Sequence, residues 1–283
     1  MSIENLRKAY HKEICARILG LRSGIPNLAD VSSKTSKILT IGLVNRLAFP
    51  LRKSPPAGQT VGTVFAELTM QFLNKSFKLL YHLRPGKWIF SASQAPTGIA
   101  AFDQYEHLAA LDTALKNHKE LAAALGGDYI IRPDIIIGRK PLSDSEINEK
   151  KDILRKGKIS TLTPLRKGNY QNPNPILHAS ISCKWTIRSD RSQNTRTEAL
   201  NLIRNRKGKT PHIVCVTGEP MPTRLASLAM GTGDIDCVYH MALPELLSSV
   251  KESGNEDQWD MLDTLISGKR LRDISDLPFD LVS

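Results

Sequence analysis

The strongest constraint on the fold is the segment from Leu177 to Lys184, in which apolar and polar side chains alternate almost perfectly. Successive side chains of a strand point to opposite faces of its sheet, so this pattern predicts a strand with one buried face. The face expected to be buried carries Leu177, Ala179, Ile181 and Cys183, and the opposite face carries His178, Ser180, Ser182 and Lys184.

Strands and helices are expected to alternate along much of the remaining chain. Residues 129–137 are rich in isoleucine and predict a strand with Asp134 in its middle, and further strands are expected over 213–217 and 236–240. Residues 140–175 are polar and rich in Pro and Asn, which indicates a long excursion across the surface. Apolar residues at helical spacing predict helices over 63–83, 104–125, 195–206, 223–230 and 257–266. This order predicts the α/β class, with a mixed central β-sheet flanked by α-helices.

The charge of the chain favours a polyanionic partner. The formal net charge is +11 and the isoelectric point is near 9.5. Nucleic acid is favoured over a membrane, because no apolar run approaches the roughly 20 residues of a spanning helix. The four cysteines lie far apart without a Cys-x-x-Cys pair, which argues against a structural zinc site and a disulfide framework. A reduced, cytoplasmic compartment is therefore expected.

Asp134, Lys184 and Glu198 form a candidate site for cleaving phosphodiesters. Such chemistry needs carboxylates to hold a divalent cation and an ammonium beside the attacked phosphate. Asp134 would bind Mg²⁺, which favours oxygen ligands. Lys184 would orient or help deprotonate the attacking water and stabilise the charge that develops on the phosphate.

Two residues next to the lysine complete this hypothesis. Many nucleases of this kind carry a second carboxylate two residues before the lysine, where this chain has Ser182. Glu198, one or two turns into the following helix, can replace it. Cys183 would offer its backbone carbonyl to the metal rather than its thiol, since soft sulfur is a poor ligand for magnesium.

Simpler interpretations exist for each of these residues. Thr195 and Glu198 have the spacing of a capping box, so Glu198 could serve only the amide donors at a helix start. Asp134 could be a surface carboxylate and Lys184 a solvated side chain. Cys183 could be a small core residue.

A second cluster, Arg188, Asp190 and Arg191, follows the predicted strand and has the groups needed to read G·C pairs. Arginine pairs with guanine O6 and N7 in the major groove, and a carboxylate accepts from cytosine N4. The alternative is an Arg–Asp salt bridge within the protein.

The segment from His178 to Arg191, with residues 201–208 after it, resembles the NgoMIV type II restriction endonucleases. The resemblance extends to Gly58-Gln59-Thr60, to Arg84-Pro85-Gly86 and to the segments 231–240 and 268–278. It covers most of the chain from about Gly58 onward.

The resemblance implies a restriction-endonuclease-like PD-(D/E)XK fold and Mg²⁺-dependent cleavage of both strands of double-stranded DNA. It implies a homotetramer built from two DNA-binding dimers, and a companion DNA methyltransferase in the same prokaryotic system. The implied target is palindromic with a CCGG core, GCCGGC, cut after the first G to leave four-base 5′ overhangs. Residues 1–283 are expected to form a single domain, with about 1–57 helical and contributing to the DNA contact.

Carried over residue by residue, the resemblance implies roles for two groups of side chains. The implied active site consists of Asp134, Ser182, Cys183, Lys184 and Glu198, with Glu67 as a further candidate offset by one residue from the family's position. The inner C·G pairs are assigned to Arg188, Asp190 and Arg191, and the outer pair to Asp30, Gln59 and Arg224.

Two other functions remain open from the sequence. A repair or structure-specific nuclease of the same fold would read shape and have no use for an Arg/Asp/Arg cluster at base edges. A non-catalytic DNA-binding protein would keep the fold without cutting, and the intact Asp/Lys/Glu set argues against it.

Overall fold

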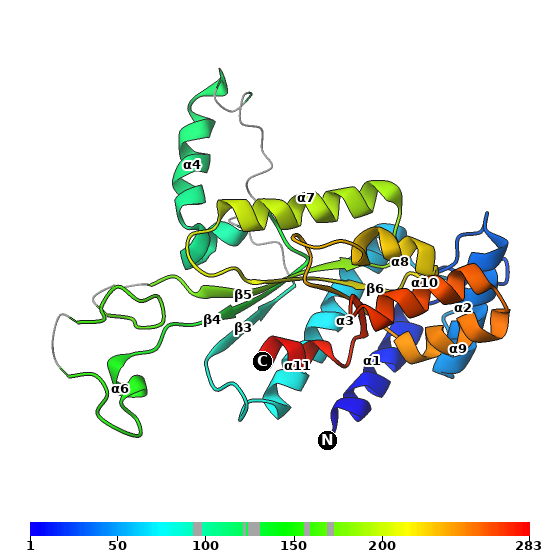
Figure 1. Cartoon of the computed structure of the whole chain (residues 1–283), viewed down its shortest axis with the longest axis horizontal. Helices are drawn as coiled ribbons and strands as arrows, with labels where there is room; N and C mark the ends of the chain where they lie inside the picture. The colour runs from blue at the N-terminus through cyan, green and yellow to red at the C-terminus, as the bar shows by residue number, and fades with distance from the viewer. Residues whose placement is uncertain (93–97, 121–122, 124–130, 156–158, 169–172) are drawn as a thin grey trace.

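A computed structural model describes residues 1–92, 98–120, 123, 131–155, 159–168 and 173–283; the side chains of residues 189–191 are outside the description. Figure 1 shows a central sheet with helices on both of its faces. The helices are α1 (Ile3–Arg17), α2 (Lys34–Leu47), α3 (Gly58–Leu79), α4 (His107–Lys116), α6 (Asp144–Ile147), α7 (Ser189–Asn205), α8 (Pro222–Ala229), α9 (Leu243–Ser253), α10 (Glu256–Ser267) and α11 (Leu277–Val282).

Six strands form the central sheet in the order β3-β4-β5-β6-β7-β8. Their bounds are β3 (Trp88–Ser91), β4 (Ile135–Arg139), β5 (Ile176–Lys184), β6 (His212–Thr217), β7 (Cys237–His240) and β8 (Leu271–Asp273). Strands β3, β4 and β5 pair antiparallel, whereas β5 to β8 pair parallel. The sheet is therefore mixed, as predicted. A separate hairpin joins β1 (Leu21–Arg22) and β2 (Ile25–Pro26).

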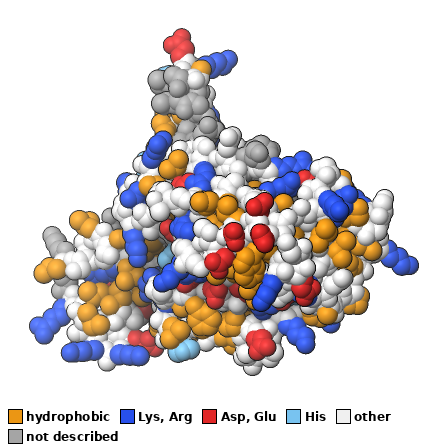
Figure 2. Space-filling view, turned by 45° about the vertical axis from the view of Figure 1, so that its right-hand side comes forward, with side chains coloured by type: hydrophobic (Ala, Val, Ile, Leu, Met, Phe, Trp, Pro, Cys, Tyr) orange, Lys and Arg blue, Asp and Glu red, His pale blue; other side chains and the backbone are white. Residues whose placement is uncertain are grey.

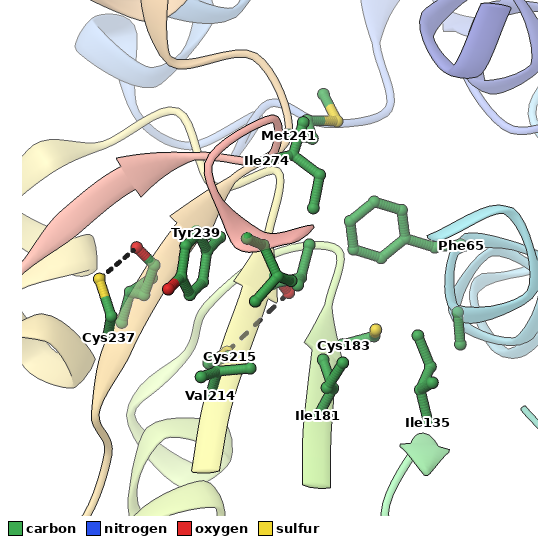
Figure 3. Close-up of a cluster of buried hydrophobic side chains, with 14 of the residues drawn as sticks. Phe65, Ile135, Ile181, Cys183, Val214, Cys215, Cys237, Tyr239, Met241 and Ile274 are labelled. Atoms are coloured by element: carbon green, nitrogen blue, oxygen red, sulfur yellow. Dashed lines mark hydrogen bonds between the residues drawn. The ribbon is translucent and has the colours of Figure 1, made fainter. Parts of the chain in front are cut away.

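Two helical layers cover the sheet and bury different parts of β5. Helix α3 packs on β3, β4 and β5, and its Phe65 lies in the core with Cys183 and Ile135 (Figure 3). Helix α7 lies along the opposite face (Figure 1), where its Ala199 and Leu202 are buried. Apolar burial in both layers fixes the sheet, and the ends of β4 and β5 are left to carry polar side chains.

The alternation of side-chain faces predicted for 177–184 holds from Ala179 to Lys184 but breaks at His178. The prediction of a single buried face is wrong, because Ser180 on the opposite face is buried as well. Pairing of β4 with β5 skips His178, because Ile137 faces Ala179 and Gly138 faces Leu177. An extra residue in a strand shifts the side chains that precede it. His178 consequently packs against Trp88 instead of lying on the Ser180 side as predicted.

Several predicted elements have different bounds in the structure, and α3 spans Gly58–Leu79 where 63–83 was predicted. The ladder of β4 begins at Ile135, so Asp134 precedes the strand instead of lying in its middle. Helix α7 begins at Ser189 rather than 195, and α4 spans only His107–Lys116 of the predicted 104–125. The predicted end of that helix, at residue 125, lies outside the described residues.

The described parts of the segment predicted as an excursion, 140–155, 159–168 and 173–175, project from the sheet and include the short helix α6 (Figure 1). In the part of the chain that the structure describes, no helix combines the length and apolarity needed to cross a membrane. On the face shown in Figure 2, acidic side chains gather near the centre and basic ones are spread around them. The net charge of +11 is therefore not displayed as one continuous patch on that face.

Candidate active site

Asp134 is tied to the strand that carries the lysine. Its Oδ2 accepts a hydrogen bond from the backbone amide of Cys183 at 2.7 Å and lies 3.4 Å from Nζ of Lys184. This contact forms where β4 leaves the ladder, just beyond the Ile135–Ile181 pair. The carboxylate thus takes the place of a missing strand partner, which sets its position relative to Lys184.

The backbone and the side chain of Cys183 lie in different environments. The N–H and C=O of one strand residue point to the same side, so the carbonyl of Cys183 points toward the side where Asp134 lies. The side chain turns into the core, where burial raises the pKa of the thiol well above its usual value. The backbone of Cys183, and not its sulfur, is available to the site.

Glu198 lies in the third turn of α7, because the helix begins at Ser189. The capping-box interpretation of Thr195 and Glu198 is therefore wrong: both residues are inside the helix. Glu198 lines one small cavity with Ser182 and Pro133, and a larger cleft with Lys184. Burial raises the pKa of Glu198, Lys184 lowers it and Asp134 raises it further, with a net increase. This half-buried carboxylate is thus within electrostatic range of both other members of the site.

Lys184 is held in its charged form by these two carboxylates. Burial of the ammonium lowers its pKa, but the negative charges of Asp134 and Glu198 contribute to a net increase. Its side chain is 21% exposed and lines the cleft. A protonated amine is therefore fixed at the cleft wall, where a phosphate can reach it.

The oxygen atoms gathered here fit a magnesium ion. Asp134 and Glu198 supply carboxylates and Cys183 supplies a carbonyl, and Mg²⁺ binds oxygen ligands while keeping several waters. Both contacts of Asp134 found among the described residues use Oδ2, so Oδ1 can take a cation. A cation would also offset the cost of keeping Glu198 ionised beside Asp134.

The proposed inner-pair readers lie at the start of α7. Arg188 is the N-cap residue of this helix, with an exposed side chain that lines both the cleft of Lys184 and a neighbouring cavity. Asp190 and Arg191 fall in the first turn of the helix, and their side chains lie outside the described residues. The cluster was predicted between the strand and the helix; its last members belong to the helix itself.

Of the three residues assigned to the outer pair, the structure brings two together. Arg224, in α8, forms an ion pair with Asp30 through its Nη2. Hydrogen bonds from Arg224 and from Ser32 hold the pKa of Asp30 well below its usual range. Gln59 lies elsewhere, in the first turn of α3, where it lines the cleft of Lys184.

Glu67 lies away from the other carboxylates. Its Oε2 is 3.2 Å from Nη2 of Arg17, and its side chain is 47% exposed. It is absent from the lining of the cleft that holds Lys184 and Glu198. We therefore place Glu67 outside the group of side chains that converge on the proposed metal.

Glu219, which lies just beyond the end of β6 and is 1% exposed, was not among the residues predicted from the sequence. Its Oε2 accepts from the amide of Ile187 at 2.8 Å, and its Oε1 accepts from the amide of Met221 at 3.1 Å. An acidic residue two positions after a buried strand was the available signal. Burial raises the pKa of Glu219 to about 6, although the two amides and Arg224 lower it and Asp30 raises it.

The raised pKa makes the stability of the fold depend on pH. Between pH 4.5 and about 6 the unfolded chain releases this proton and the folded chain keeps it, so the stability falls as pH rises. We expect the free energy of unfolding of the wild type, minus that of Glu219→Gln, to be about 2 kcal/mol larger at pH 4.5 than at pH 7.5. Urea denaturation of both proteins at the two pH values measures this difference, and equal values would contradict it.

Comparison with known proteins supports one family. The chain matches the family model described as NgoMIV restriction enzyme over residues 10–283. The type II restriction enzyme NgoMIV of Neisseria gonorrhoeae is 46% identical over 279 residues, which cover 97% of this chain and 96% of that protein. A solved restriction endonuclease PspGI–substrate DNA complex is 14% identical over 89% of this chain and 96% of its own, with a TM-score of 0.25, a likeness too slight to carry an argument.

Proposed function

Because the chain belongs to the NgoMIV restriction enzyme family and is a type II site-specific deoxyribonuclease, we propose that Asp134, Lys184 and Glu198 carry out its cleavage with Mg²⁺. The family, together with the mixed sheet between helical layers, confirms the predicted restriction-endonuclease-like PD-(D/E)XK fold. The observation that supports the assignment best is the approach of Asp134 to the Cys183 amide and to Lys184.

Each group in the cleft has a defined task. Asp134, Glu198 and the Cys183 carbonyl would hold the ion, which would supply positive charge beside the attacked phosphate and make water a stronger nucleophile. Lys184 donates hydrogen bonds to the attacking water and to a phosphate oxygen, and stabilises the negative charge that develops there. The products are 5′-phosphate and 3′-hydroxyl ends.

The target we propose is GCCGGC, cut after the first G to leave four-base 5′ overhangs. Arg188, Asp190 and Arg191 read the inner C·G pairs, because guanidinium groups match guanine and a carboxylate matches cytosine. Arg224 and Asp30 offer the same two chemistries side by side for the outer pair, and their ion pair orients both groups before DNA arrives. Gln59 approaches the DNA from the catalytic cleft.

A palindromic target calls for a symmetric assembly. We propose that two chains bind one site as a dimer and that two dimers associate as a tetramer. The enzyme would act in the cytoplasm, beside a methyltransferase that protects the host's own sites.

Digestion of a sequenced plasmid with and without Mg²⁺, followed by mapping of the ends, tests this function. We expect cuts at GCCGGC with 5′ overhangs in the presence of the metal only. Discrete cuts at another sequence would overturn the assigned base readers, and cuts governed by DNA shape would favour a structure-specific nuclease.

Arg224→Ala tests the reading of the outer pair. Removing the guanidinium deletes one base contact and leaves the Asp30 carboxylate without its partner, so specific binding should weaken by about 1–3 kcal/mol. Competition binding with the target and with a duplex altered only at the outer pair measures the effect. The altered duplex should lose little affinity; an equal loss on a scrambled duplex would make Arg224 a phosphate contact.

A further inference from the structure

The two segments that carry the proposed base readers are joined through one buried side chain. Ile187 directly precedes Arg188, the N-cap residue of α7, and Met221 is the N-cap residue of α8, whose first turn holds Arg224. Both amides donate to Glu219, one to each carboxylate oxygen. A single carboxylate thus connects the starts of two helices that come from different parts of the chain.

Glu219 is itself firmly held at the end of β6. Its own amide donates to Oγ1 of Thr217 at 3.1 Å, and its carbonyl is 3.2 Å from Nε2 of His240. The side chain therefore projects from a fixed point of the sheet. Movement of either helix start relative to the sheet would break a charge-assisted hydrogen bond in a buried place, where such a loss is costly.

The cavity next to this connection is lined by residues from both segments. Ile187 and Arg188 contribute from one side, Thr223 and Arg224 from another, and Asp30 faces Arg224. Readers of adjacent base pairs must keep one spacing, because each hydrogen-bonding pattern sits at a fixed place in the groove. Glu219 supplies a rigid connection between the two sets.

We propose that Glu219 is a positioning residue that holds the inner-pair and outer-pair readers in one register, so that discrimination at both base pairs depends on it. The inference rests on the proposed base-reading function of Arg188 and Arg224. Within the described residues, the carboxylate of Glu219 accepts its hydrogen bonds from the backbone amides of Ile187 and Met221, so it acts through those segments and not on the DNA.

The first test is Glu219→Gln. A glutamine has one acceptor oxygen and presents an NH₂ group to the second amide, so it breaks one of the two connections. Rates would be measured as kcat/KM on the site that the wild type cuts, and on duplexes with one base changed at the inner or the outer pair. We expect the preference for the correct site to fall about tenfold or more at both positions.

Asp273→Asn is the matched control. Asp273 is also a buried carboxylate that accepts hydrogen bonds from backbone amides, those of Leu243 and Ser275, and its ion pair is with Arg7 rather than with a proposed base reader. The Asp273→Asn variant should have a lower free energy of unfolding but the same preference for the correct site as the wild type. The proposal would be overturned if folded Glu219→Gln kept the wild-type preference for the correct site, or lost it at one base pair only. An equal loss of preference in Asp273→Asn would overturn it as well.

A second pair of variants tests the connection without altering the carboxylate. Met221→Pro removes the amide that donates to Glu219, whereas Met221→Ala keeps it. Discrimination at the outer pair should fall in the proline variant and persist in the alanine variant. Equal behaviour of the two would count against the proposal even if Glu219→Gln does not fold. If the wild type cuts discretely at a sequence other than GCCGGC, the proposed target is wrong. The comparisons between wild type and variants are then made on the sequence that is cut, so the role of Glu219 is still tested.

Discussion

Lys184→Ala is expected to lower the rate of DNA cleavage by about 10³-fold or more while leaving specific DNA binding largely intact. The ammonium is fixed 3.4 Å from Asp134 at the wall of the cleft, and alanine removes the only charge-stabilising donor that we assign to the attacked phosphate. Single-turnover cleavage measures the chemical step, and a gel-shift assay without divalent metal measures binding.

Lys207→Ala is a suitable control for this variant. Lys207 is 54% exposed and pairs with Glu106 at the surface, so its loss should not affect the chemical step. If Lys184→Ala lost specific binding along with cleavage, the lysine would be a binding residue and its assignment to the chemical step would fail.

Glu198→Gln should slow cleavage by about 10²- to 10³-fold and raise the Mg²⁺ concentration needed for half-maximal rate. The amide has nearly the same shape but cannot balance the charge of the ion. Burial and Asp134 raise the pKa of Glu198, so its charged form costs free energy in the metal-free fold. The variant should therefore melt, without metal, at or above the wild-type temperature.

Glu67→Gln provides the comparison for the metal-binding role. Its carboxylate pairs with Arg17 outside the cleft, so both the rate and the Mg²⁺ requirement should match those of the wild type. An unchanged Mg²⁺ requirement in Glu198→Gln, or a shift in Glu67→Gln, would mean that the second metal carboxylate has been assigned wrongly.

The sequence predicted the order of the elements around the site better than their ends. Alternation in 177–184 placed Lys184 on its strand, because that pattern is local. The start of α7 was misplaced because Arg188 gives it no side-chain cap, whereas Thr195 and Glu198 inside the helix resemble one. Asp134 was placed within a strand because the isoleucine run does not show where pairing with β5 stops.

Contacts between distant segments were beyond prediction from local patterns. The two amides that donate to Glu219 belong to residues 187 and 221. Residue 187 lies close to residue 219 because β5 pairs with β6. The ion pair of Asp30 and Arg224 joins residues 194 positions apart. The resemblance assigned both residues of that ion pair to the outer base pair, but the contact between them is seen only in the structure.

The hydrogen bond between Asp134 and the Cys183 amide joins positions 49 residues apart at the point where β4 and β5 stop pairing. Asp134 and Lys184 are consequently brought together by the same event that closes the sheet. On the proposed assignment, a chain in which these two strands are still apart has its catalytic groups scattered and cannot cut. The capacity to cut DNA therefore follows from the completed pairing of β4 with β5.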